Sequence, residues 1–176
     1  MHERFTEGDI VTFVPGAELA ETVRWRHIAC ARTKSDARPE WRKEGDMTLV
    51  HHNPDEAPAP LGGYSQALEI APGARLLFIS GQIPERPGEE MAADFRGQCE
   101  AVWNNIEALL AAAGMDIDDL VKVTTFLTDR DQVLENREVR RRYLGNASPA
   151  MTVVIAQTLD PRWLLEIEAI AARTAD

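Results

Sequence analysis

The sequence predicts an α+β fold in which one mixed β-sheet carries two helices on one face. The continuous apolar run of residues 76–79 is typical of a buried strand. An apolar stripe over 95–113, with spacings of four and three, is typical of a helix that covers a sheet. The elements follow the order strand, strand, strand, helix, strand, helix, strand, strand, which fits a single sheet covered on one side.

The composition indicates one compact domain. The chain has 176 residues, of which 44% are hydrophobic and 27% charged, as is ordinary for a globular protein. No run approaches the roughly 18 apolar residues of a membrane helix. Residues 1–5 lack the apolar core of a signal peptide. We therefore expect a cytoplasmic protein with no membrane partner.

The net charge argues against a nucleic-acid-binding protein, and the cysteine spacing argues against a metal site built on cysteines. A net charge of −10 repels phosphate backbones, so we expect no nucleic-acid partner. The basic triplet 140–142 follows Glu135 and Glu138 at helical spacing, which favours a solvated helix face. Cys30 and Cys99 lie far apart without metal-like spacing and are expected to be reduced, structural thiols.

The chain divides into an N-terminal extension, residues 1–46, and a domain, residues 47–176. Residues 10–14 are β-branched and predict a short strand, whereas 21–32 fits a strand or the start of a helix. The polar stretch 33–46 is typical of a linker. Because so few residues bury little surface, we expect an arm that packs on its own or a neighbouring subunit.

The first half of the domain predicts three strands and a helix. Residues 48–52 form the first strand, in which His51 and His52 point to opposite faces and so cannot serve one metal. The strands 65–70 and 75–80 flank the turn Ala71-Pro72-Gly73-Ala74 and are expected to pair as a hairpin. The helix then ends at Gly114, a natural C-terminal stop.

The second half of the domain predicts strand, helix, strand, strand. Residues 121–127 alternate, with the odd-numbered side chains on one face. Asp129 or Asp131 can cap the second helix. Along this helix, spacings of four, three and four separate Val133, Arg137, Arg140 and Leu144. Residues 151–156 predict a buried strand, and 164–172 the last strand.

A few polar residues could carry chemistry. Tyr64 follows two glycines that free the backbone to turn a phenol inward, although a tyrosine that packs on the sheet fits equally. Ser80 and Gly81 offer a hydroxyl and an open amide at a strand end. No His/Asp pair is placed to make Ser80 a nucleophile, so it could simply end the strand.

Glu166 and Glu168 share one face of the last strand. A carboxylate beside a buried strand is costly unless it is paired, hydrated or functional. In a partly apolar pocket it would suit accepting and returning a proton of water. A solvent-facing or salt-bridged strand is the alternative.

Three segments together resemble the reactive intermediate deaminase family, RidA/YjgF, long labelled endoribonuclease L-PSP. They are Gly62-Gly63-Tyr64-Ser65-Gln66-Ala67, the stretch from Leu76 to Pro84 that contains Ser80-Gly81-Gln82, and Leu165-Glu166-Ile167-Glu168-Ala169-Ile170-Ala171. The likeness extends from about residue 47 to residue 173. It implies a chorismate-mutase-like fold, a homotrimer with ligand pockets between subunits, and no metal or organic cofactor.

The resemblance also implies a set of site residues. The family's ligand-binding tyrosine, serine, glycine and glutamate correspond to Tyr64, Ser80, Gly81 and Glu166, with the glutamate acting on the attacking water. Three positions depart from the family. Met151 stands where the family has an arginine, Val153 where it has a cysteine, and Arg137 where a helix asparagine aligns, although Asn136 is adjacent.

The missing arginine shapes the expected function. An arginine grips the carboxylate of an imino acid by a bidentate, charge-assisted pair that methionine cannot imitate. Met151 and Val153 share a strand face and would make one pocket apolar. We therefore expect a deaminase-like hydrolase that acts on a small imine or enamine outside the α-imino acids. The alternative is a non-catalytic, metabolite-binding or regulatory trimer. An arginine at 24, 26, 32 or 137 could replace the missing cation.

Overall fold

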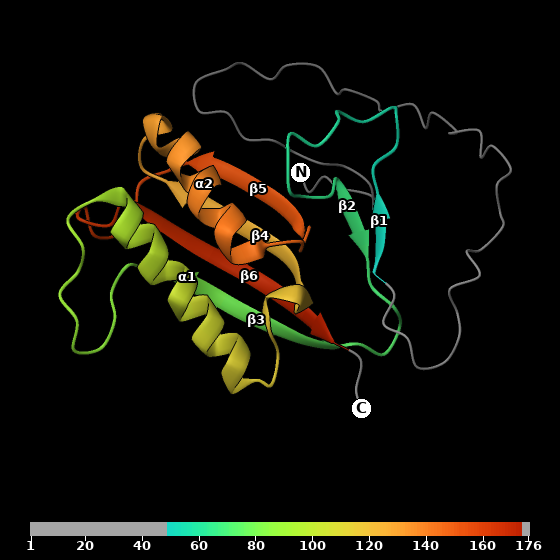
Figure 1. Ribbon diagram of the computed structural model, residues 1–176, viewed down its shortest axis with the longest axis horizontal. Helices are drawn as coiled ribbons and strands as arrows, with labels where there is room; N and C mark the ends of the chain where they lie inside the picture. Colours follow the sequence, from blue (N-terminus) through green and yellow to red (C-terminus); the bar gives the residue numbers. More distant parts are fainter. Residues whose placement is uncertain (1–48, 174–176) are drawn as a thin grey trace, which may run out of the picture. The chain divides into compact units, whose positions relative to one another are not determined.

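The computed structural model describes residues 49–173 of the chain. The predicted extension 1–46, its strand at 10–14 and Cys30 lie outside the described residues. Two short 3-10 helices, Ile117–Asp119 and Arg130–Gln132, accompany the main elements. Those elements are, in order (Figure 1), β1 (Val50–His52), β2 (Ala67–Glu69), β3 (Arg75–Gln82), α1 (Phe95–Ala112), β4 (Leu120–Leu127), α2 (Val133–Leu144), β5 (Ala150–Ile155) and β6 (Leu165–Arg173).

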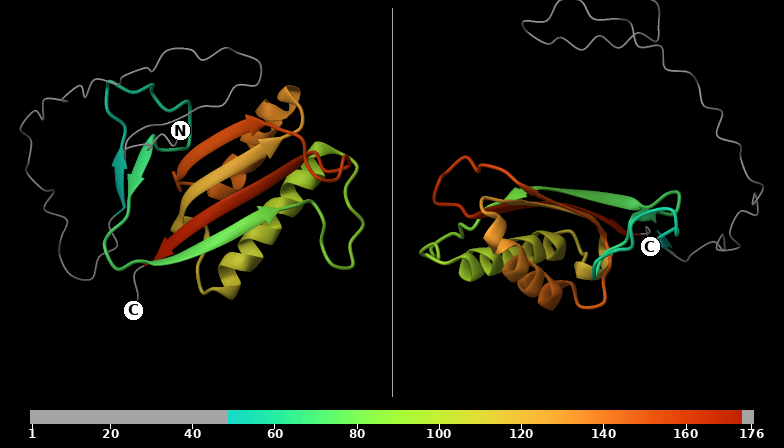
Figure 2. Two further views of the ribbon diagram at one scale, coloured as in Figure 1. Left: turned by 180° about the vertical axis from the view of Figure 1, so that it is seen from behind. Right: turned by 90° about the horizontal axis from the view of Figure 1, so that it is seen from above.

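The main sheet confirms the predicted mixed sheet with two helices on one face. Its four strands lie in the order β3-β6-β4-β5, where β4 and β5 are parallel and the other neighbours antiparallel. Both helices lie on the same side of this sheet, as the view from above in Figure 2 shows. The core forms between them, from α1 side chains such as Trp103 and Ile106 and from the buried face of β4 and β6.

The local signals of α1 are those that the sequence predicts. Asp94 caps the helix by accepting a hydrogen bond from the Gly97 amide at 2.7 Å. Gly114 follows the helix with a φ of 68°, a left-handed conformation that glycine adopts without strain. Asp129 likewise caps the turn that leads into α2. Neither helix of the described part is long and apolar enough to cross a bilayer.

The predicted hairpin of the second and third strands is wrong. The turn exists, with Gly73 at a φ of 86°, but its flanking strands enter different sheets. β2 pairs with β1 in a separate two-stranded sheet, whereas β3 pairs with β6 at the edge of the main sheet. Leu77 and Ile79 reach the core only when β3 lies beside β6. The burial of these two side chains therefore determines the partner of β3 and outweighs the turn signal.

Two strands that the sequence predicts as buried are not covered on both sides. On β3, Ile79 is buried while Phe78 is 71% and Leu76 46% exposed. On the edge strand β5, residues 152–155 are all exposed in the single chain. The bare side of the main sheet, which we call the open face, carries no helix among the described residues (Figure 2, view from behind). Apolar side chains therefore stand uncovered on it, including Leu76, Phe78 and Val154.

Candidate functional site

A cavity of about 300 Å³ lies between α2, β5 and the segment that precedes β2. Four of the residues that the sequence singles out line this cavity: Tyr64 from the loop, Arg137 from α2, and Met151 and Val153 from β5. A volume of this size suits a small metabolite. The cavity is lined by Leu61, Tyr64, Gln66, Val133, Asn136, Arg137, Arg140, Met151 and Val153.

The strand side of the cavity is apolar because of the register of β5. Met151 pairs with Val123 and Val153 with Thr125, and these β4 residues belong to the buried face under the helices. Since neighbouring residues in register point to the same side of a sheet, both β5 side chains face α2. The cavity therefore has a thioether and an isopropyl group along its strand wall.

Tyr64 reaches the cavity because the residues on either side of it are fixed. Gly62 and Gly63 adopt positive φ values of 109° and 63°, which bend the loop. Ser65 is 2% exposed, and its amide donates to the Pro149 carbonyl at 3.2 Å, which ties the loop to the start of β5. The phenol oxygen of Tyr64 accepts from the Leu61 amide at 3.3 Å.

Arg140 is a cavity residue that the sequence argument missed. The basic triplet is expected to lie on a solvated face, but Arg140 is only 6% exposed, while Arg141 and Arg142 are exposed. Burial, and to a smaller extent the charge of Arg137, lower the pKa of Arg140. The signal that could have revealed the burial of Arg140 is its four-residue spacing from Leu144, because both residues lie on the buried side of α2.

Cys99 contacts the cavity residue Asn136, and its environment shows why the thiol is inert. Both are buried, and the Cys99 Sγ donates a weak hydrogen bond to the Asn136 Oδ1 at 3.9 Å. Burial raises the pKa of Cys99 to about 12, with smaller contributions from nearby glutamates. The thiol stays protonated near neutral pH, so Cys99 fills space and is not a nucleophile.

A second group of candidate residues lies on β3 and β6. Ile79 pairs with Ala169 and Gln82 with Ile167, so Ser80 and Gly81 together oppose the single residue Glu168. This is a β-bulge, a feature that redirects side chains and is common beside active sites. At the bulge the Glu166 carboxylate lies against Gly81, and a Cβ on Gly81 would come within 1.7 Å of Glu166 Oε1. Only glycine leaves room for this carboxylate.

The two groups lie on opposite faces of the main sheet. Glu166 pairs with Phe126, which pairs with Val154, and all three belong to the open face. The predicted alternation of β6 is confirmed, because Leu165 and Ile167 are buried while Glu166 and Glu168 reach the opposite face. Within one chain, Ser80, Gly81 and Glu166 are therefore not part of the cavity that Tyr64, Arg137, Met151 and Val153 line.

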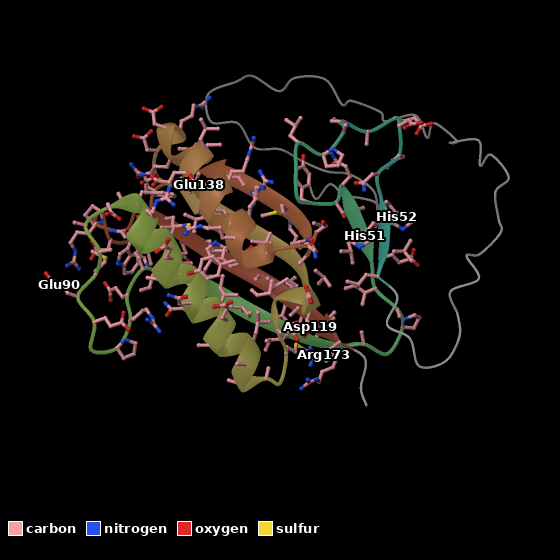
Figure 3. All side chains as sticks on the ribbon, viewed as in Figure 1. His51, His52, Glu90, Asp119, Glu138 and Arg173 are labelled. Atoms are coloured by element: carbon pink, nitrogen blue, oxygen red, sulfur yellow. The ribbon has the colours of Figure 1, made fainter. Side chains whose placement is uncertain are left out.

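The two histidines of β1, which are labelled in Figure 3, take structural partners. His51 Nδ1 lies 2.6 Å from the Ser65 Oγ, and His52 Nε2 lies 3.2 Å from Glu69 Oε2. Because the Ser65 hydroxyl donates its one proton to the Ser148 carbonyl, it accepts from His51 and is not activated as a nucleophile. Among residues 49–173, no three histidine, cysteine or acidic side chains are placed to hold a metal ion.

Comparison with known proteins places the chain in a family. A family profile described as Endoribonuclease L-PSP matches residues 54–173. A RutC family protein of Pyrococcus horikoshii is 41% identical over 119 residues, which cover 66% of this chain and 92% of that protein. TdcF of Escherichia coli K12, described as a candidate reactive intermediate deaminase, is 33% identical over 123 residues, 68% of this chain and 93% of TdcF.

Solved structures agree in fold. The structure of E. coli TdcF with bound serine has a TM-score of 0.54 and 32% identity, and the match covers 71% of this chain and 99% of TdcF. A structure of the Rid family protein YyfB from Yersinia pestis has a TM-score of 0.63 and 26% identity, covering 72% and 100% of the two chains. The matched residues contain the cavity and the bulge, and this chain belongs to the RidA/YjgF family of endoribonuclease L-PSP proteins.

Proposed function

We propose that the protein is a deaminase-like hydrolase of the RidA/YjgF family that acts on a small imine or enamine. The observation that carries this proposal is the Glu166 carboxylate held against Gly81 at the β3 bulge. A carboxylate in this position is unpaired among the described residues and stands beside the hydroxyl-bearing Ser80. It offers a proton acceptor next to polar groups that can hold a substrate nitrogen.

The reaction is hydrolysis of a carbon–nitrogen double bond. Glu166 accepts a proton from water as the water oxygen bonds to the imine carbon, and the Ser80 hydroxyl and Gly81 amide hold the polar end. The protonated carboxyl returns this proton to the nitrogen, which gives a carbinolamine. Glu166 then accepts the proton of the carbinolamine hydroxyl and passes it to the amine nitrogen as the carbon–nitrogen bond breaks, and a carbonyl compound and ammonia leave. Ordinary acid–base chemistry at one carboxylate accomplishes this sequence, and we propose no metal or cofactor.

The substrate that we propose is not an α-imino acid. Such a substrate carries its carboxylate on the reacting carbon, and Met151 offers no charge to it. Losing a bidentate guanidinium contact costs on the order of 3 kcal/mol, or about a hundredfold in affinity. Met151 and Val153 instead favour an apolar substituent at the strand wall of the cavity.

A complete site requires a second copy of the chain. We propose that a neighbouring subunit brings its bulge and Glu166 to the cavity of the first, in a homotrimer. The exposed apolar side chains of the open face support assembly, because a patch that includes Phe78, at 71% exposure, is costly in water. The relative TdcF, which holds serine in its crystal structure, supports a small ligand for this family member too.

Ammonia release tests the proposal. The substrates are 2-iminopropionate and an imine of similar size without the α-carboxylate, each corrected for spontaneous hydrolysis. We expect turnover of the second substrate, and a fall of at least about a hundredfold in Glu166→Gln. Glu168→Gln is the matched control, because Glu168 lies on the same face two residues away and is exposed. Equal turnover by Glu166→Gln and wild type would contradict the role of Glu166.

A non-catalytic trimer that binds a metabolite is the second candidate. The apolar strand wall favours it, because a cavity can retain a ligand without activating water. Under this alternative a small ligand raises the melting temperature equally in the wild type and Glu166→Gln, and no imine is consumed. Product formation on either imine excludes it.

A further inference from the structure

The helix wall of the cavity differs from its strand wall. Arg137 and Arg140 stand three residues apart on α2, and both line the cavity opposite Met151 and Val153. Residues three apart on a helix are neighbours on one surface. We propose that these two guanidinium groups form an anion-binding subsite, which holds the carboxylate of a small organic ligand.

Burial of Arg140 is the first reason. Its side chain is only 6% exposed, and its Nε has no hydrogen-bond partner in the part of the chain that the structure describes. Within the same residues, neither Arg140 nor Arg137 forms an ion pair. A buried guanidinium without a counter-charge is costly, so a helix that keeps one at a cavity has a use for it.

The charge of the cavity is the second reason. Within one chain, its nine lining residues include two arginines and no acidic residue, although the net charge is −10. In the proposed trimer the one carboxylate added to the cavity is Glu166 of the neighbouring copy, which leaves two cations for one acidic side chain. Two like charges on one helix face repel each other, and a bound anion removes that repulsion. Guanidinium groups present planar forks of donors that match a carboxylate.

The two walls together define the ligand class. An anion fits the α2 side and a short carbon chain fits the β5 side, so the ligand is a small carboxylate with an apolar portion. For the substrate this inference rests on the proposed function. The anion subsite and the proposed reaction are compatible when the carboxylate belongs to a substituent of the imine, away from the reacting carbon, where α2 can hold it.

Calorimetric titration of the purified full-length protein with butyrate at constant ionic strength tests the subsite. The variants are Arg140→Met, Arg137→Gln and, as the matched control, Arg141→Gln, because Arg141 is exposed on the same helix. We expect butyrate to bind the wild type and Arg141→Gln equally, and to bind Arg140→Met at least about tenfold more weakly. Arg137→Gln should weaken binding as well, and the neutral butyramide should bind none of them measurably.

Two further measurements separate the outcomes. Arg140→Met should melt at the same or a higher temperature, since the change removes an unpaired buried charge; a lower melting temperature would show that Arg140 has a protein partner and would overturn the subsite. Equal butyrate affinity in Arg140→Met and wild type would also overturn the subsite. So would a protein that binds inorganic phosphate but does not bind butyrate. Glu166→Gln should still bind butyrate, so failure of imine turnover leaves this result intact.

Discussion

At the scale of single residues, Gly81 has a function that its lack of a side chain makes possible. Its backbone is not in the left-handed region, so conformational freedom is not the reason for glycine here. The reason is space, because the Glu166 carboxylate occupies the volume that a Cβ would fill. The glycine therefore sets the position of the carboxylate, while the bulge sets the position of the glycine.

Gly81→Ala should lower imine turnover with little loss of stability. The new methyl group meets the flexible end of Glu166, which can rotate away, so the free energy of unfolding should change by about 1 kcal/mol or less. A displacement of the carboxylate by about 1 Å should nevertheless cost roughly ten- to a hundredfold in kcat/KM. Steady-state ammonia release and urea unfolding measure the two effects.

A double variant is the control for that experiment. If Gly81 acts through Glu166, adding Gly81→Ala to Glu166→Gln should cause no further loss of activity. A multiplicative loss would mean that the methyl group obstructs the substrate itself. Ser80→Ala provides a comparison at the same bulge, because it removes a hydroxyl and leaves the space beside Glu166 unchanged.

At the scale of elements, Gln98 of α1 fixes the start of β6. This side chain is 2% exposed. Its Nε2 donates to the carbonyls of Ala92 and Arg162, both at 3.0 Å, and its Oε1 accepts from the Leu164 amide at 2.8 Å. One side-chain amide thus joins the loop before α1 to the segment that enters β6, two residues before Glu166.

Gln98→Met should destabilise the protein by about 3 kcal/mol, because it leaves buried backbone groups without partners. The volume of the side chain is nearly kept, so a cavity does not contribute. Urea unfolding followed by circular dichroism gives the free energy. Glu107→Met, on the exposed face of the same helix, should change it by no more than about 0.5 kcal/mol. Similar losses in the two variants would argue against the hydrogen-bond explanation.

The sequence predicts elements better than it predicts pairing. The spacing of apolar residues and the Gly114 stop define α1, since both signals act within a few residues. The partner of β3 depends instead on where Leu77 and Ile79 find a core, which no local turn signal contains. A strand's alternation predicts which side chains share a face. On the helix α2, the spacing of Arg140 from Leu144 indicates its inward position, whereas the basic triplet favours a solvated face.

In the candidate site, too, local features can be predicted from the sequence, whereas relations between strands cannot. The spacing of Met151 and Val153 gives their common face, and the two glycines before Tyr64 give its turn. The register of three strands, however, decides that Glu166 and Met151 lie on opposite faces. That relation joins residues from β4, β5 and β6, so it is available only from the structure.

At the scale of the whole molecule, the open face is the surface on which we propose that copies of the chain assemble. It includes the exposed Phe78 of the edge strand β3, which pairs with Ile170 of β6. At the end of the same sheet the buried Asp119 pairs with the partly exposed Arg173 (both labelled in Figure 3), with Arg173 Nε donating to Asp119 Oδ1 at 2.8 Å. The apolar open face, by contrast, is the surface that we propose another copy of the chain covers.

Subunit mixing tests whether each site is shared by two copies. Glu166→Gln disables the bulge group, and Val153→Trp fills the cavity with an indole, so each variant alone should be inactive. When the two are unfolded together in equal amounts and refolded, roughly a quarter of the interfacial sites should combine an intact bulge with an intact cavity, because each site draws independently on two chains. Ammonia release should recover to that fraction. A mixture that stays as inactive as its components would place the whole reaction within a single chain and reject the shared site.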